Sequence, residues 1–132
     1  MADIISGKDV AEKILTTKIK NKVDELKTKD IIPTLVVILV GDVKASASYV
    51  RQKEKFASKA GINSEVRRFP DSISEQEILD EILKINKDDN IHGVIVQLPL
   101  PDHISVTKVL NSIDPSKDVD GFTPTNVGKL FL

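Results

Sequence analysis

The sequence lacks cysteine and tryptophan, and only 4% of its 132 residues are aromatic. Without cysteine, disulfide bonds, thiolate catalysis and cysteine-based zinc sites are excluded, which agrees with a cytoplasmic protein. The two histidines, His92 and His103, stand eleven positions apart with no carboxylate-rich helix between them. We therefore expect no metal site.

An excess of positive charge is also missing. The 19 lysines and arginines nearly balance the 20 aspartates and glutamates, so the formal net charge is −1. A nucleic-acid groove or a membrane-binding patch needs a local basic excess, and no apolar run approaches the ~20 residues that span a bilayer. The N-terminal residues contain neither the basic nor the long apolar region of a signal peptide. We expect neither nucleic acid nor membrane as a partner.

Common nucleotide and hydrolase motifs are absent as well. None of the six glycines forms a G-x-G pair, and there is no P-loop, G-x-S-x-G or H-E-x-x-H motif. The chain therefore carries no dinucleotide-binding fingerprint of its own.

What the sequence does contain is an alternation of strand-like and helix-like segments. Strands are predicted at 34–41, 63–69 and 92–101, and the first is a continuous β-branched run of the kind that parallel sheets bury on both faces. Helices are predicted at 8–27, at 46–60, after a capping box at 74–77, near 104–111, and from 126 onward. Strands separated by helices indicate βαβ units. The predicted fold is α/β, a three-layer αβα arrangement with a mostly parallel sheet.

Local signals mark the helix ends and the faces directed at the core. Ser6 with Asp9 is a predicted cap pair, and Gly61 is a predicted helix stop. At helical spacing, the residues expected to face the core are Val10, Ile14, Ile19, Val23 and Leu26, and then Ile78, Leu79, Ile82, Leu83 and Ile85.

One lysine interrupts the apolar face of the predicted helix 46–60. On a helical wheel Lys53 is the only charged residue inside an apolar arc formed by Tyr49, Val50, Phe56, Ala57 and Ala60. It either lays its methylenes on the core with its ammonium in water, or points into a half-desolvated cleft where proton transfer becomes easier. Tyr49 lies one turn earlier and would face the same pocket. Both interpretations of Lys53 remain open.

Two more stretches fall where α/β sheets form sites, outside the carboxyl ends of strands. Gln97 is the first polar residue after a strand, and its amide suits a heterocycle or a lysine amine, or else loop amides. Pro99 and Pro101 stiffen the following segment. The Asp120–Gly121 pair is typical of a turn, although a carboxylate can also bind the amino–imino edge of a pterin or guanine ring.

Together these stretches resemble the bifunctional methylenetetrahydrofolate dehydrogenase/methenyltetrahydrofolate cyclohydrolase family. Residues 40–62, VGDVKASASYVRQKEKFASKAGI, are similar to the family's first signature with its Y-V-x-x-K-x-K core. GVIVQLPLP at 93–101 and KDVDGFTPTNVGKL at 117–130 are similar to the next two signatures, in the same order and at matching separation. The three matches extend over essentially the whole chain.

The resemblance implies NADP- or NAD-dependent oxidation of 5,10-methylenetetrahydrofolate to 5,10-methenyltetrahydrofolate, and hydrolysis of that product to 10-formyltetrahydrofolate. It implies that Lys53 is the acid–base residue at the bridging carbon, that Tyr49 stacks near the aminobenzoate ring, and that Gln97 hydrogen-bonds the lysine. The implied substrate-binding residues are Asp120 at the pterin edge, Ser46, whose alternative role is helix capping, and the backbone of Leu98, Pro99, Leu100 and Pro101.

The resemblance also has consequences for domain organisation. Family members continue into a Rossmann-type domain that binds NADP or NAD and carries much of the homodimer contact. Residues 1–122 would then be the folate-binding catalytic domain, and residues 123–132 would begin a linking helix toward a nucleotide-binding domain absent from this chain. The implied roles are in purine and amino-acid biosynthesis.

Two other functions compete with an active enzyme. Because the family's cleft lies between two domains, this chain is alternatively a folded but catalytically silent folate-binding fragment. A flavodoxin-like signalling domain shares the α/β pattern and a functional lysine. Such domains need an acidic pair after the first strand and a phosphoacceptor aspartate at a middle strand, whereas here Asp42 stands alone and the strand 94–96 is followed by Gln97.

Overall fold

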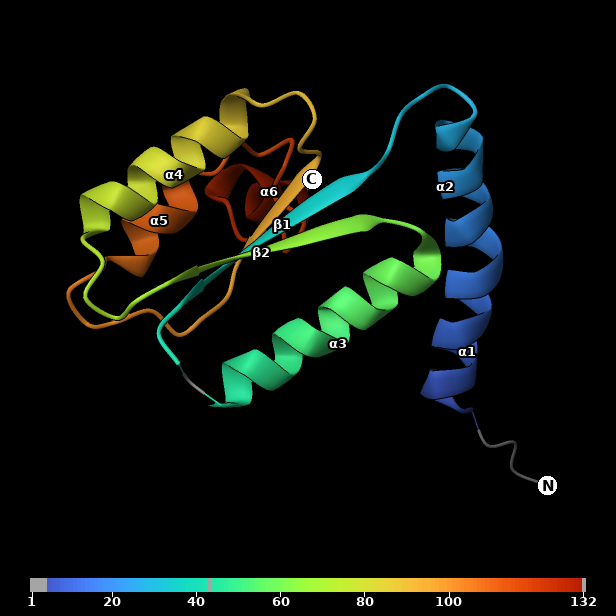
Figure 1. Cartoon of the computed structure of the whole chain (residues 1–132), viewed down its shortest axis with the longest axis horizontal. Helices are drawn as coiled ribbons and strands as arrows, with labels where there is room; N and C mark the ends of the chain where they lie inside the picture. The colour runs from blue at the N-terminus through green and yellow to red at the C-terminus, as the bar shows by residue number, and fades with distance from the viewer. Residues whose placement is uncertain (1–4, 43, 132) are drawn as a thin grey trace.

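The computed structural model has three parallel strands with helices on both faces of the sheet (Figure 1). It describes residues 5–42 and 44–131, except for the side chains of residues 44–47. Strands β1 (Thr34–Val40), β2 (Asn63–Phe69) and β3 (Gly93–Val96) lie in the order β2-β1-β3, and both pairings are parallel. The predicted α/β fold with its parallel sheet is confirmed.

The N-terminal helix is one continuous run with a wider turn in the middle. It consists of α1 (Gly7–Ile14), the π-helical turn η1 (Leu15–Ile19) and α2 (Lys20–Lys27). The Ser6 hydroxyl accepts a hydrogen bond of 3.3 Å from the Asp9 backbone N–H, so the predicted cap is present. In and beside η1, the Thr16 and Thr17 hydroxyls donate to carbonyls four residues earlier, where they compete for acceptors of the helix ladder.

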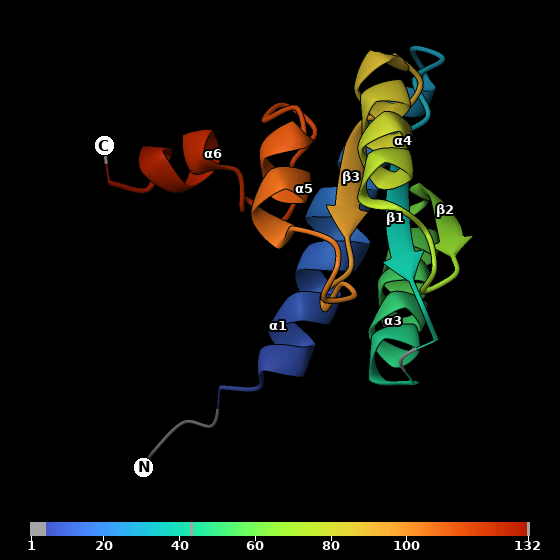
Figure 2. The ribbon, with the colours of Figure 1, turned by 90° about the vertical axis from the view of Figure 1, so that its left-hand side faces the viewer.

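The other helices begin and end close to their predicted limits. Helix α3 (Lys44–Ala60) ends at Gly61, whose φ of +79° is the left-handed conformation of a helix stop. Helix α4 (Glu75–Lys87) opens with the reciprocal Ser74–Glu77 capping box. Helices α5 (Val106–Ser112) and α6 (Pro124–Lys129) follow, and Figure 2 shows α6 extending away from the sheet beyond α5. Both α3 and α6 begin two residues before the predicted position.

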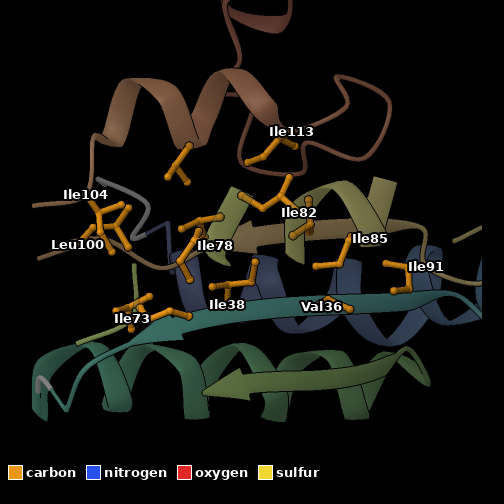
Figure 3. Packing of buried hydrophobic residues seen from close by; sticks show 14 residues of the cluster. Val36, Ile38, Ile73, Ile78, Ile82, Ile85, Ile91, Leu100, Ile104 and Ile113 are labelled. Atoms are coloured by element: carbon orange, nitrogen blue, oxygen red, sulfur yellow. The ribbon is translucent and has the colours of Figure 1, made fainter. Parts of the chain in front are cut away.

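The sheet separates two apolar layers. Val36, Ile38 and Val40 of β1 pack on the side of α4 and α5, whereas Val37 and Leu39 pack on the side of α3. Figure 3 shows the larger cluster, with the isoleucines of α4 above β1. Successive residues of a strand point to opposite faces, so burial on both faces accounts for the continuous apolar sequence of β1.

The core prediction for α4 holds for its isoleucines and fails at one leucine. Ile78, Ile82 and Ile85 are fully buried, and Leu79 is partly buried against the same cluster. The prediction for Leu83 is wrong, because 51% of the surface of this residue is exposed.

The core prediction for the N-terminal helix is largely wrong. Val23 is buried and Leu26 half-buried, but Val10, Ile14 and Ile19 are 48%, 42% and 38% exposed. The N-terminal helix contacts α3 through η1 and α2, and these contacts leave Val10, Ile14 and Ile19 exposed. Among the described residues, no helix combines the length and apolarity needed to cross a bilayer.

Candidate active site at the carboxyl ends of the strands

The contact between Lys53 and Gln97 is the centre of the site. Lys53 lies on α3, with the buried Val50 one turn before it and the buried Ala57 one turn after it. Its Nζ lies 3.4 Å from Oε1 of Gln97, and both side chains are half-buried. The lysine that the helical wheel singled out therefore meets the first polar residue after β3.

Gln97 is held by two further hydrogen bonds. Its backbone N–H donates to the carbonyl of Ile38 in β1 at 2.9 Å. Its side-chain Nε2 donates to the carbonyl of Leu98 at 2.8 Å. With the amide N–H₂ group bound to the backbone, the amide oxygen is directed at the lysine and accepts a hydrogen bond from it.

Two aromatic residues of the predicted apolar arc lie outside the core. Tyr49 is 63% exposed and Phe56 is 46% exposed, so the buried strip of α3 is narrower than predicted and, among the helix's described side chains, consists of Val50, Ala57 and Ala60. Tyr49 does precede Lys53 by one helical turn, as expected. In the described chain, however, the tyrosine ring is a surface group.

The segment after Gln97 contains both buried and exposed residues. The Leu98–Pro99 peptide bond is cis. Leu100 is buried in the larger cluster and Leu98 packs partly against it, whereas Pro99 is exposed and Pro101 half-buried. The Ser46 side chain, also predicted for substrate binding, lies outside the described residues.

Asp120 lies on a loop that runs along β3. The backbone N–H of Val94 donates to the carbonyl of Lys117 at 2.8 Å, and Val94 and Asp118 form a parallel bridge. The chain therefore continues toward the carboxyl end of β3, the end at which Gln97 lies. Asp120 is exposed there, and it is followed by Gly121, whose φ of +72° makes the turn.

Asp118 is a residue to which the sequence analysis gave no role. One carboxylate oxygen accepts from the backbone N–H groups of Gly121 and Phe122, at 2.9 and 3.3 Å. The other accepts from the Thr123 N–H at 2.8 Å and the Asn126 side-chain amide at 3.1 Å. Burial alone would raise the pKa of Asp118, but these hydrogen bonds outweigh it and lower the pKa. An aspartate three residues before a glycine is the signal that would have indicated such a turn.

Several residues predicted for the site, namely Tyr49, Pro99 and Asp120, are exposed. Pockets of about 370 to 490 Å³ lie elsewhere on the described surface, for example between α1 and α3 beside Phe56, and near His92 at the opposite end of the sheet. Neither of these two pockets is lined by Lys53, Gln97 or Asp120.

Comparison with known families identifies the family of this chain. A family model described as tetrahydrofolate dehydrogenase/cyclohydrolase, catalytic domain, matches residues 5–120. The chain belongs to this family. Lys53, Gln97, Asp118 and Asp120 all lie within the matched region.

Relatives and solved structures of the family extend beyond this chain. The bifunctional protein FolD of Nautilia profundicola is 55% identical over 127 residues, which cover 96% of this chain and 44% of that protein. The crystal structure of the bifunctional FolD dehydrogenase/cyclohydrolase from Campylobacter jejuni superposes with a TM-score of 0.91 at 48% identity, covering 94% of this chain and 44% of that one. The Trypanosoma brucei enzyme complexed with NADP cofactor and inhibitor has the same TM-score at 34% identity, over 99% of this chain and 44% of that one. The chain therefore spans less than half the length of these relatives.

Proposed function

We propose that this chain is the folate-binding catalytic domain of a bifunctional methylenetetrahydrofolate dehydrogenase/methenyltetrahydrofolate cyclohydrolase. The observation that carries the proposal is the half-buried Lys53 held 3.4 Å from the Gln97 amide oxygen, at the strand ends of a domain of this family. Among the described side chains at this end of the sheet, this amine is the one best placed to exchange protons with a bound ligand.

The hydrolysis uses groups that this chain contains. In the proposal, Lys53 as the free amine takes a proton from the water that attacks the bridging carbon of methenyltetrahydrofolate. The resulting ammonium returns a proton to N5 as the bond from N5 to that carbon breaks. The new carbonyl oxygen loses its remaining proton to solvent, which leaves the formyl group on N10. Gln97 positions the lysine through its amide oxygen.

The remaining folate contacts come from the same end of the sheet. Asp120 binds the amino–imino edge of the pterin, and the exposed Tyr49 stacks on the aminobenzoate ring. Ser46 and the backbone of residues 98–101 complete the substrate site. A ligand lying across these groups would cover surface that is exposed in the described chain.

The oxidation requires a nicotinamide that accepts a hydride from the bridging carbon. The residues of this chain do not fit that cofactor, because no pair of its glycines forms a phosphate-binding G-x-G turn. In the proposal NADP or NAD binds a C-terminal domain outside this chain, residues 1–122 are the folate domain, and residues 123–132 begin the linking helix. The greater length of the relatives and the NADP complex of the Trypanosoma brucei enzyme support this assignment.

The proposal extends to the cellular role. The longer protein would be a cytoplasmic homodimer that interconverts one-carbon folates for purine and amino-acid biosynthesis. The bifunctional FolD relatives support the metabolic part. The proposed reactions of this chain involve folate and water, with no metal, nucleic acid or membrane.

Replacing Lys53 tests the catalytic assignment. Because general acid–base groups contribute about 10²- to 10⁴-fold to rate, we expect Lys53→Met to slow hydrolysis of methenyltetrahydrofolate at least about 100-fold. Lys55→Met, an exposed lysine two residues along the same helix, is the matched control and should retain full activity. Turnover is measured by the loss of the methenyl absorbance, with circular dichroism to verify folding. Normal turnover in a folded Lys53→Met variant would contradict the assignment.

A second function is supported by the exposure of the site. Tyr49 and Asp120 are surface groups here, so the chain alone would bind folate weakly and remain catalytically silent. Calorimetry with tetrahydrofolate, together with the turnover assay, distinguishes the active folate domain from the silent fragment. Tight binding together with turnover supports the active domain, whereas weak binding without turnover supports the silent fragment.

A further inference from the structure

One carboxylate joins the Asp120 loop to the first turn of α6. Asp118 accepts from Gly121 and Phe122 through one oxygen, and from Thr123 and Asn126 through the other. Thr123 is the N-cap residue of α6 and is buried, with 2% of its surface exposed. Asn126 also donates to the carbonyl of Pro115 at 2.8 Å, which fixes the orientation of its amide.

We propose that Asp118 is a positioning residue that holds Asp120 in place for the ligand and couples this loop to α6. The inference rests on the proposed function, in which Asp120 binds the pterin. Asp118 itself would touch no substrate atom. Its two carboxylate oxygens already accept four hydrogen bonds, two each.

The loop is fixed on both sides of Asp120. On the N-terminal side, Asp118 is bridged to Val94, and the Lys117 carbonyl accepts from Val94. On the C-terminal side, the next three backbone N–H groups are bound to the Asp118 carboxylate. A binding group held at both ends loses little freedom when a ligand arrives, which favours affinity.

The close approach of the loop to β3 supports the same conclusion. A Cβ atom built on Gly93 would lie 2.7 Å from Cγ1 of Val119, the residue between the two aspartates. The loop therefore lies directly on the glycine of β3. Its position depends on the strand as well as on the Asp118 carboxylate.

The distinguishing experiment is a double-mutant cycle. Asp118→Asn is nearly isosteric, but it replaces one carboxylate oxygen by an N–H₂ group. The donors that bind this oxygen in the wild type would then face another donor. Loss of hydrogen bonds to a charged group typically weakens binding about tenfold or more, so we expect that loss in tetrahydrofolate affinity for Asp118→Asn and for Asp120→Asn. Because Asp118 acts through Asp120, the double variant should bind no more weakly than Asp120→Asn alone.

Asp114→Asn is the matched control. Asp114 forms the same kind of turn, and its carboxylate accepts from the backbone N–H and hydroxyl of Ser116 at 2.8 and 2.7 Å. It should change the unfolding midpoint but not the affinity. In the ligand-free chain, amide hydrogen exchange at Gly121 and Thr123 should quicken in Asp118→Asn and stay unchanged in Asp114→Asn.

Each result decides the role of Asp118. Unchanged affinity, losses that add in the double variant, or unchanged exchange at Gly121 would each overturn it. If Asp118→Asn does not fold, Asn126→Ala takes its place in the cycle with Asp120→Asn. The double variant should again bind tetrahydrofolate no more weakly than Asp120→Asn alone. If the wild-type chain binds no tetrahydrofolate, the proposed function fails and the role of Asp118 fails with it. Binding by the wild type with full affinity in Asp118→Asn rejects the positioning role alone.

Discussion

At the scale of single residues, adjacent positions on α4 have opposite environments. Ile82 is fully buried between α4 and the sheet, whereas its neighbour Leu83 is 51% exposed. We expect Ile82→Ala to lower the free energy of unfolding by about 2–5 kcal/mol, because it removes buried methyl groups and leaves a cavity. Leu83→Ala should cost less than about 1 kcal/mol. Urea unfolding measures both, and equal losses would contradict the packing described.

The same contrast shows what helical periodicity can predict. Ile78 and Ile82 on α4 and Val50 on α3 are buried, as the apolar arcs predict. The burial of residues at the edge of an arc depends on the width of the neighbouring element. The sequence of a single helix gives no information on that width. Leu83, Tyr49 and Phe56 are edge positions of this kind. Lys53 was recognisable because it lies at the centre of an arc, where a charged side chain is unexpected.

At the scale of elements, the contact between β3 and the Asp120 loop can be tested at a glycine. A methyl group on Gly93 would lie 2.7 Å from Val119 Cγ1, so Gly93→Ala must displace the Val119 side chain that rests on β3. Overpacking of this kind costs about 1–3 kcal/mol of unfolding free energy, and we expect tetrahydrofolate affinity to fall as well. Urea unfolding and calorimetry measure the two effects.

Gly128→Ala is the control for this prediction. A Cβ atom at Gly128 meets nothing within 4 Å, and Gly128 lies inside α6. Because alanine is favoured over glycine in a helix, stability should stay unchanged or rise by up to about 1 kcal/mol. Equal losses of unfolding free energy in Gly93→Ala and Gly128→Ala would mean that the close approach of the loop to Gly93 does not cause the destabilisation.

Elements were predictable where short-range chemistry determines them. The β-branched run specified β1, and the capping box and Gly61 fixed the helix ends. The loop at 117–123 has no periodicity, and its shape depends on where one carboxylate finds its donors. Turn chemistry indicated Asp120–Gly121. The hydrogen bond from Asn126 to Asp118 and the bridge between Asp118 and Val94 of β3 depend instead on the tertiary structure. The resemblance to the family directed attention to Asp120 and left Asp118 without a role.

At the scale of the whole molecule, the described chain leaves one helical face uncovered. Val10, Ile14 and Ile19 repeat at helical spacing, as the sequence predicted, yet they are exposed on the N-terminal helix. Helical spacing of apolar residues therefore does not by itself establish that their side chains are buried.

Acid stability is also a property of the whole molecule, because carboxylates on several elements contribute to it. Hydrogen bonds accepted in the folded state, from Lys108, Ser74, Asn90 and Ser116 respectively, lower the pKa of Glu75, Glu77, Asp88 and Asp114. The ordinary values are 4.5 for the glutamates and 3.8 for the aspartates. The unfolded chain therefore takes up protons at a higher pH than the folded chain.

The sign of the pH dependence follows from this difference. The contribution of these groups is fully present above their ordinary pKa values and is lost as the pH falls through the lowered folded values. We expect the free energy of unfolding, measured with urea between about pH 7 and pH 3, to decline below about pH 4.5. Glu77→Gln removes one of the groups and should give lower stability at neutral pH with a shallower decline. A flat profile in the wild type would mean that these hydrogen bonds do not favour the ionised carboxylates, and the capping box of α4 would then stabilise the fold independently of its charge.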